Sequence, residues 1–172
     1  MAVACQQSAP NTPRGISPQQ LAERYASVRR RTLSLIEGLS GEDLVPQSMP
    51  DASPGKWHLA HTTWFFEAMV LGPLARQQPY CNDWHYLFNS YYETLGERHP
   101  RPQRGLLTRP SLAEVLEWRS DIDRRIADVI ATVSNDAAIR RLIELGTHHE
   151  QQHQELLVTD IKHLLAQNAL AP

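Results

Sequence analysis

The sequence predicts an all-α protein in which four helices form a bundle, with a long crossover between the second helix and the third. In four segments of the chain, apolar residues recur at intervals of three and four, which is the period of an amphipathic helix. A capping signal that contains Ser, Asn or Asp stands before each of these segments. No segment shows the strict alternation of a strand or the turn of a hairpin, so the pattern favours a helical bundle.

The first predicted helix follows an N-terminal segment without periodicity. Residues 1–16 mix Gln, Ser, Pro, Asn and Gly, so we expect a disordered leader before a single domain over residues 17–172. Ser17 begins the first helix with a capping box, and the apolar period ends before Gly41. The three consecutive arginines at 29–31 are expected to form a solvated face of this helix.

The second predicted helix covers residues 57–71 and follows the start signal Ser53-Pro54. It stops before the Gly-Pro pair that comes next in the chain. Residues 73–110 then form the crossover, which is rich in Pro and Arg and is expected to contain one short helix over residues 85–95. Connections of this length in a compact domain are usually functional or disordered.

Two further capping signals open the third and fourth helices. Ser111 and Glu114 form a capping box before a helix that continues to Ile130. Asn135-Asp136 precedes a fourth helix that is predicted to end at about Ala166. On this last helix an inward-facing seam is expected, made of Leu142, Gly146, His149, His153, Leu156, Asp160 and Leu164.

Length and composition limit the classes of function. The 172 residues fit one domain, and 17 Lys and Arg against 19 Asp and Glu give a formal net charge of −2. A chain with this balance lacks the basic surface that phosphate binding needs, so we expect no nucleic-acid partner. The longest apolar runs are far below the roughly 18 residues of a membrane span, and no signal peptide is recognisable at the N-terminus. We therefore expect a cytoplasmic protein without a membrane partner.

A histidine pair on the fourth helix has the spacing of metal ligands. His149 and His153 are four positions apart, so their imidazoles lie one turn apart on one face. That face is the predicted inward seam, where an unsatisfied polar group costs on the order of 1–3 kcal/mol. A metal ion would satisfy both rings at once.

The second helix offers a third histidine. His61 shares an apolar stripe with Trp57 and Trp64, so it is a better inward candidate than His58. Together with the pair on the fourth helix it would give three nitrogen ligands and leave coordination positions open, as in a reactive metal centre. Asp160 could orient a ligand, bind the metal itself, or serve in capping or pairing. The remaining histidines are expected near the site or on the surface: His58, His85, His99, His148 and His163.

Residues 149–153 also match H-E-x-x-H, the zinc protease motif in which the glutamate, here Glu150, is the general base. The rest of the sequence argues against a protease. Only Glu155 and Asp160 remain as acidic ligand candidates after the motif, and the longer H-E-x-x-H-x-x-G-x-x-H form is not matched. An all-helical domain also lacks the strand edge on which a peptide substrate is commonly held.

Four blocks of the chain carry a resemblance to a known family. They are Ser53-Pro54 with WHLAHTTWFFE at 57–67, FNSYY at 88–92, RHPRPQRGLL at 98–107 and HEQQHQELL at 149–157. In combination they resemble the N-terminal DinB-like domain of the sulfoxide synthases of ergothioneine biosynthesis, the hercynine oxygenase family. The resemblance implies a DinB-like four-helix bundle that binds a mononuclear non-haem iron(II), with His61, His149 and His153 at the ligand positions.

The same resemblance implies an O2-dependent oxidoreductase. In the family, a cysteine-type thiol, free or as γ-glutamylcysteine, is joined to the imidazole of hercynine (trimethylhistidine), and the sulfur becomes a sulfoxide. Arg101 and Arg104 match arginines that hold carboxylates of the thiol substrate, and Gln152 matches a position that contacts hercynine. The family's catalytic tyrosine belongs to a second, C-terminal domain similar to formylglycine-generating enzymes. These 172 residues do not contain that domain, so no catalytic residue is assigned.

Two other functions stay open. A stand-alone DinB-like bundle could use a zinc or nickel ion held by three histidines to activate a thiol, as a thiol transferase. The chain could also be a non-enzymatic metal-binding helical module. Three imidazoles suit zinc, nickel and iron comparably, so only the resemblance favours iron.

Overall fold

The computed structural model describes residues 16–90, 97–132 and 136–170. All regular structure in these ranges is helical, which confirms the predicted all-α class for that part of the chain. Almost all of the predicted leader lies outside the described residues.

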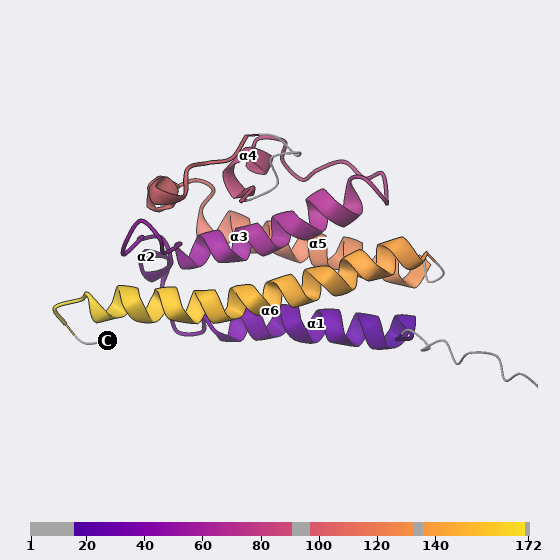
Figure 1. Cartoon of the computed structure of the whole chain (residues 1–172), viewed down its shortest axis with the longest axis horizontal. Helices are drawn as coiled ribbons and strands as arrows, with labels where there is room; N and C mark the ends of the chain where they lie inside the picture. Colours follow the sequence, from indigo (N-terminus) through magenta and orange to yellow (C-terminus); the bar gives the residue numbers. More distant parts are fainter. Residues whose placement is uncertain (1–15, 91–96, 133–135, 171–172) are drawn as a thin grey trace, which may run out of the picture.

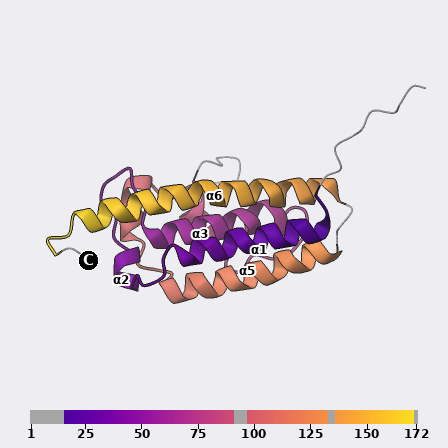
Figure 2. The same ribbon diagram turned by 90° about the horizontal axis from the view of Figure 1, so that it is seen from below.

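Four long helices lie side by side along the long axis of the molecule (Figures 1 and 2). They are α1 (Pro18–Ser34), α3 (Gly55–Phe66), α5 (Leu112–Thr132) and α6 (Ala137–Ala166). Helix α3 packs against both α5 and α6, and α1 packs against the same two helices. A π-helical turn, η1 (Glu67–Leu71), continues α3 to the end that the sequence predicts.

Three further short helices lie in the described part of the chain. Helix α2 (Gly41–Leu44) lies between α1 and α3 in the chain, while α4 (Trp84–Phe88) and the 3-10 helix η3 (Arg101–Leu106) belong to the segment between η1 and α5. In Figure 1, α4 lies beside α3, on the side opposite α1. The short helix predicted at 85–95 begins at Trp84 and ends at Phe88, because Asn89 takes an extended backbone with φ −69° and ψ 135°. Residues 91–95 of that prediction lie outside the described residues.

Helix α1 begins as predicted and ends earlier. Ser17 Oγ accepts a hydrogen bond from the backbone N–H of Gln20 at 3.1 Å, and the Gln20 side chain accepts from Ser17 N at 2.8 Å. The predicted end before Gly41 was wrong, because Gly38 adopts φ 84°, in the left-handed region that no helix residue occupies. A second capping box, between Ser40 and Asp43, then opens α2.

Helix α6 begins and ends as predicted, but its buried face differs from the predicted seam. The Asp136 side chain caps it by accepting from Ala138 N at 2.8 Å. Leu156 is 40% exposed, so the apolar end of the seam was assigned to the wrong face. The buried residues of α6 are Ile139, Ile143, Gly146, Thr147, Glu150, Leu157 and Ile161. They lie about a quarter turn from the predicted seam because α6 packs against α1 and α3 at once.

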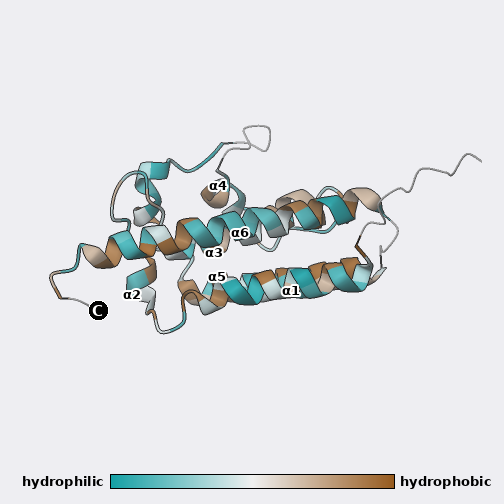
Figure 3. Ribbon diagram, turned by 60° about the horizontal axis from the view of Figure 1, so that its bottom comes forward, coloured by the Kyte–Doolittle hydropathy of each residue, from teal (hydrophilic) through white to brown (hydrophobic). Residues whose placement is uncertain are grey.

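The core is centred on α3, whose twelve residues are all buried. Trp64, Phe65 and Phe66 from α3 belong to one hydrophobic core with Trp118 of α5, and all four are among the largest fully buried side chains. The side of α1 seen in Figure 3 is mainly hydrophilic, as expected for a helix with one solvated face. None of the described helices has the length and apolar character needed to cross a membrane.

Gly146 lets α6 approach α3 closely. A Cβ atom at this position would lie 2.4 Å from Cε1 of Phe66 and 3.0 Å from Cε1 of Phe65. Only a glycine allows this spacing without a shift of the phenylalanine rings or of a helix. The contact lies one turn before His149, so it brings that histidine up to α3.

Candidate metal centre

His61 projects from the middle of α3 and is 1% exposed. Its Nδ1 atom lies 2.6 Å from the backbone oxygen of Phe88. A carbonyl oxygen only accepts, so Nδ1 carries the proton and Nε2 keeps a free lone pair. That lone pair faces α6, where Nε2 of His149 lies 3.3 Å away.

The three histidines predicted as ligands come together. One ligand nitrogen from each of His61, His149 and His153 lies within 4.8 Å of the other two. The ring centroids of His153 are 4.6 Å from those of both His61 and His149. Three donors from two packed helices could therefore hold a metal ion.

The surroundings keep these imidazoles neutral. Burial lowers the pKa of His149 to about 4. Burial, followed by the neighbouring His149, holds the pKa of His61 well below its usual value, and burial with the neighbouring His61 and His58 does the same for His153. Neutral rings offer lone pairs to a cation, which is the form that binds metals.

The donor set fits a transition-metal ion. His149 Nδ1 is buried and has no hydrogen-bond partner among the described residues, so the ring is not fully satisfied by protein contacts alone. Imidazole nitrogens are common ligands of zinc, iron, nickel and copper, and unsuited to calcium or magnesium. The residues present therefore fit the three-histidine metal site that the sequence predicts, without distinguishing among those metals.

His58 and Asp160 lie directly behind this group. His58 is 2% exposed, and its Nδ1 atom is 2.9 Å from Nδ1 of His153. On the other side of the ring, Nε2 is 2.9 Å from Oδ2 of Asp160, which also accepts from Ser53 N at 2.8 Å. Burial lowers the pKa of His58 and would raise that of Asp160, but hydrogen bonds from His58 and Ser53 lower the pKa of Asp160 overall. Of the roles left open for Asp160, the structure shows pairing with His58.

Aromatic rings cover both faces of His61. Trp57 stacks on one side, with centroids 4.5 Å apart and an angle of 11° between the rings, and Trp64 lies at 5.6 Å. Trp57 in turn carries a cation–π contact, because the guanidinium carbon of Arg104 lies over the indole at 3.4 Å from the ring centroid. The imidazole plane of His61 is therefore held both by contacts with the two indole rings and by the hydrogen bond from Nδ1 to Phe88.

A cavity of about 220 Å³ opens beside the three histidines. Arg101, Arg104 and Gln152, the residues predicted to bind substrate, all lie on its wall. Its full lining is Ser53, Trp57, His58, His61, Ser90, Arg101, Arg104, His149, Gln152, His153, Leu156 and Asp160. Four residues of the predicted seam of α6 therefore face this cavity rather than the apolar core: His149, His153, Leu156 and Asp160.

The two arginines differ in their surroundings. Arg104 is 5% exposed and donates to Ser53 Oγ at 2.8 Å and to Ser90 Oγ at 3.2 Å. Arg101 is exposed and donates to the backbone oxygen of Asp51. Arg101 can therefore reorient toward a ligand, whereas Arg104 presents a fixed positive charge.

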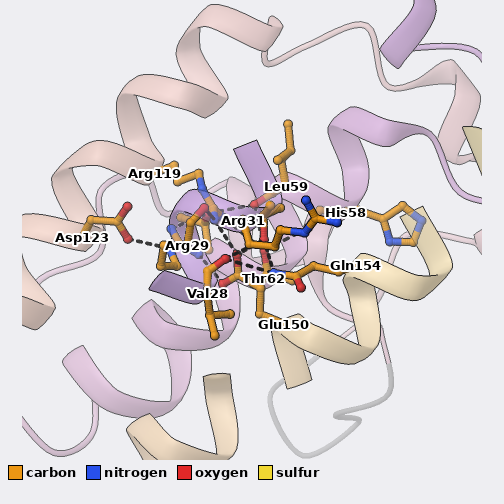
Figure 4. Close-up of polar contacts among 12 residues, drawn as sticks. Val28, Arg29, Arg31, His58, Leu59, Thr62, Arg119, Asp123, Glu150 and Gln154 are labelled. Carbon is orange, nitrogen blue, oxygen red and sulfur yellow. Dashed lines mark hydrogen bonds and ion pairs between the residues drawn. The ribbon is translucent and has the colours of Figure 1, made fainter. Parts of the chain in front are cut away.

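Glu150, the glutamate of the H-E-x-x-H match, is turned away from the cavity. It is fully buried and accepts hydrogen bonds from Arg29 at 2.9 Å and from Arg119 (Figure 4). The hydroxyl of Thr32 donates to the same carboxylate. Burial alone would raise its pKa, but Arg119 and Arg29 lower it to about 2. A carboxylate held between two arginines is no general base for this site, which agrees with the expectation that the chain is not a protease of this type.

The solvated face expected for the arginines at 29–31 was wrong for Arg29, which is 3% exposed. Sequence reasoning missed its ion pairs with Glu150 and Asp123. The signal was present in the helical period, because Arg29 lies four and eight positions after the buried Tyr25 and Leu21. A charged residue on an apolar face indicates a buried partner.

In the described residues, the fold and the site together define a helical protein with a candidate three-histidine metal centre. The family model described as the DinB superfamily matches residues 24–157, and the chain belongs to this superfamily. No curated protein matches the chain. The predicted DinB-like domain is therefore confirmed at the level of the superfamily.

Proposed function

We propose that the chain is the iron(II)-binding, DinB-like four-helix bundle of an O2-dependent sulfoxide synthase that joins a cysteine-type thiol to hercynine. One observation carries the proposal. His61, His149 and His153 converge at a single cavity, and Arg101, Arg104 and Gln152 line the same cavity. These six residues come from three segments that are far apart in the sequence, and the resemblance assigns all of them to one site.

When bound, iron(II) supplies coordination positions at which a thiol, hercynine and O2 can meet. Each side chain then has a task of its own. The three neutral imidazoles hold the ion, and the exposed guanidinium of Arg101 pairs with a carboxylate of the thiol substrate. The exposed amide of Gln152 hydrogen-bonds the imidazole of hercynine.

Arg104 contributes a fixed charge to the same cavity. Its two serine partners and the Trp57 ring hold the guanidinium in one place, so substrate binding costs little additional ordering of this side chain. The positive charge attracts an anionic thiol substrate toward the metal.

The proposal extends to the setting of the reaction. Hercynine, cysteine or γ-glutamylcysteine, and O2 are the proposed partners, in the cytoplasm, with no nucleic acid and no membrane. A C-terminal domain similar to formylglycine-generating enzymes would complete the substrate pocket and supply the catalytic tyrosine. Turnover is therefore best assayed with the full reading frame as well as with these 172 residues.

A second candidate is a zinc- or nickel-dependent thiol transferase on the same fold. The observation that favours it is the donor set itself, because three neutral imidazoles without a carboxylate suit these metals as well as iron. A thiol bound at such an ion loses its proton and becomes nucleophilic.

Metal binding and turnover discriminate these functions. Protein is loaded without oxygen with iron(II), zinc(II) or nickel(II), and bound metal is measured for wild type, His149→Ala and the matched control His148→Ala, an exposed neighbour on α6. We expect His149→Ala to lose the ion and His148→Ala to keep it. The ion should also stabilise the fold, by about 2.7 kcal/mol at a hundredfold excess over Kd.

The turnover assay then separates the reactions. Iron-loaded protein that consumes O2 and forms a hercynine–thiol sulfoxide, detected by mass spectrometry, supports the synthase. Zinc- or nickel-loaded protein that conjugates a thiol without O2 refutes it in favour of the transferase. Metal binding with neither reaction in the full reading frame points to a binding module, and unchanged metal content in His149→Ala refutes the site.

A further inference from the structure

We infer that Asp160 and His58 form a hydrogen-bonded pair that fixes the orientation and the tautomer of His153, and so act as positioning residues for the metal centre. The inference rests on the function proposed above for the assignment of His153 as a ligand. The sequence placed His58 and Asp160 only near the site, without a shared role.

Asp160 anchors one end of this chain of hydrogen bonds. Its Oδ2 atom accepts from Ser53 N at 2.8 Å, just before α3 begins, and lies 2.9 Å from Nε2 of His58. A carboxylate has no proton to donate, so Nε2 of His58 must carry the N–H. The contact joins α6 to α3 and sets the rotation of the His58 ring.

The tautomer of His58 determines the tautomer of His153 through the hydrogen bond between their Nδ1 atoms. A neutral imidazole has one N–H, and in His58 that proton lies at Nε2, so Nδ1 is an acceptor. Nδ1 of His153 lies 2.9 Å from it and must therefore donate. The proton of His153 is thereby held at Nδ1, and its Nε2 lone pair is left for the ion shared with His61 and His149.

His61 has the same arrangement with a different acceptor. Its Nδ1–H donates to the Phe88 carbonyl, which leaves Nε2 free in the same way. Outer hydrogen bonds of this kind orient ligand imidazoles and raise their basicity, and their loss typically costs about 10- to 100-fold in metal affinity. The site thus has two ligands whose tautomers are set by hydrogen bonds from outside the donor group.

The first test reads the tautomers directly, without metal. Protein labelled with ¹⁵N-histidine is examined by two-bond ¹H–¹⁵N correlation NMR at neutral pH. We expect the Nδ1–H tautomer for His153 and the Nε2–H tautomer for His58. An Nε2–H tautomer at His153 overturns the inference, whether or not the protein binds a metal.

The second test follows zinc(II) and cobalt(II) affinity, with the cobalt absorption spectrum as a report on ligand geometry. His58→Leu and Asp160→Leu should weaken binding by about 10- to 100-fold and alter the cobalt spectrum. His58→Gln and Asp160→Asn keep an acceptor and a donor at these positions, so they should recover most of the affinity. The exposed His148→Ala is the matched control and should bind as wild type does.

The outcomes separate this inference from the proposed function. Wild-type protein that binds no metal refutes the function, while the NMR tautomers still decide the role of the pair. Wild-type metal affinity in folded His58→Leu and Asp160→Leu overturns the inference and leaves the three-histidine site standing. If a leucine variant does not fold, the wild-type tautomers and the two conservative variants decide.

Discussion

Arg29 of α1 and Glu150 of α6 form an ion pair in the interior, with Nη1 and Oε2 2.9 Å apart and side chains 3% and 0% exposed. Arg119 of α5 contacts the other oxygen of the same carboxylate. The carboxylate and its two arginines therefore connect α1, α5 and α6 at the position next to His149. This geometry favours one register of α6, because a slip of one residue would leave a buried charge alone.

Removing the charge of Glu150 should destabilise the fold strongly. Glu150→Gln leaves Arg119 buried without a contacting carboxylate, and leaves Arg29 with Asp123 as its remaining ion-pair partner, so we expect a loss of about 3–5 kcal/mol in the free energy of unfolding. Urea denaturation measures it. Glu155→Gln, at an exposed position on the same helix, is the control and should leave the midpoint where it is. Wild-type stability in Glu150→Gln would contradict the structural role.

Glu150 also predicts an acid transition. Its pKa in the fold is about 2, below the ordinary value of 4.5, so its ionised form is favoured in the folded state. The ionised carboxylate contributes on the order of 3 kcal/mol to the free energy of unfolding. This contribution is present above about pH 4.5 and is lost as the pH falls toward 2. Urea midpoints measured between pH 5 and pH 2 should fall in wild type and change less in Glu150→Gln.

Gly146→Ala should disturb both packing and site. The added methyl would lie 2.4 Å from Cε1 of Phe66, so either the Phe66 ring or α6 must shift. Overpacking of this kind typically costs about 1–3 kcal/mol, and a shift at this contact disturbs the position of His149, which lies one turn further along α6. Urea denaturation and zinc titration should both show a loss. Gly41→Ala, where no atom lies within 4 Å of the new Cβ, should match or slightly exceed wild-type stability.

The buried imidazoles predict that metal-free protein loses stability on mild acidification. Burial lowers the pKa values of His58, His61, His149 and His153 below 6.5, so the unfolded chain takes up protons that the fold excludes. Stability is present above pH 6.5 and falls below it, by up to about 1.4 kcal/mol per pH unit for each imidazole. Thermal unfolding between pH 8 and pH 5 measures the slope. His61→Phe should reduce it, and a flat profile would contradict the burial of neutral rings.

Alanine substitutions of Arg101 and Arg104 should affect different properties, substrate binding for Arg101 and the stability of the fold for Arg104. Arg104→Ala removes donors to Ser53 and Ser90 and the contact with Trp57, so it should cost about 1–3 kcal/mol in the free energy of unfolding. Arg101→Ala should leave the urea midpoint unchanged and weaken only the binding of an anionic thiol. Equal destabilisation by both variants would argue against the structural difference between them.

Much of the fold could be predicted because its signals are local. The capping residues Ser17, Ser111 and Asp136 each bond the first turn of their helix, so three starts were correct to a residue. The early end of α1 could not be predicted with the same rules, because it depends on Gly38 taking a left-handed backbone. Apolar residues continue past that point, and the period alone does not detect the break.

The candidate ligands could be found from spacing, whereas their surroundings could not. His149 and His153 share one face of a helix whatever that helix packs against. The role of His58 depends on the rotation of α3 against α6, which no local pattern fixes. Arg29 and Glu150 are 121 positions apart, and each charge taken alone is typical of a surface residue.

The stacking of Trp57 and Trp64 around His61 gives the protein an optical reporter of its own site. Two of the four tryptophans lie in ring contact with a candidate metal ligand. An open-shell ion held by His61 would quench their emission through energy or electron transfer, while closed-shell zinc(II) has no low-lying states that do so. Tryptophan fluorescence therefore distinguishes iron(II), cobalt(II) or nickel(II) from zinc(II) in the unlabelled protein, without substrate and before any product forms.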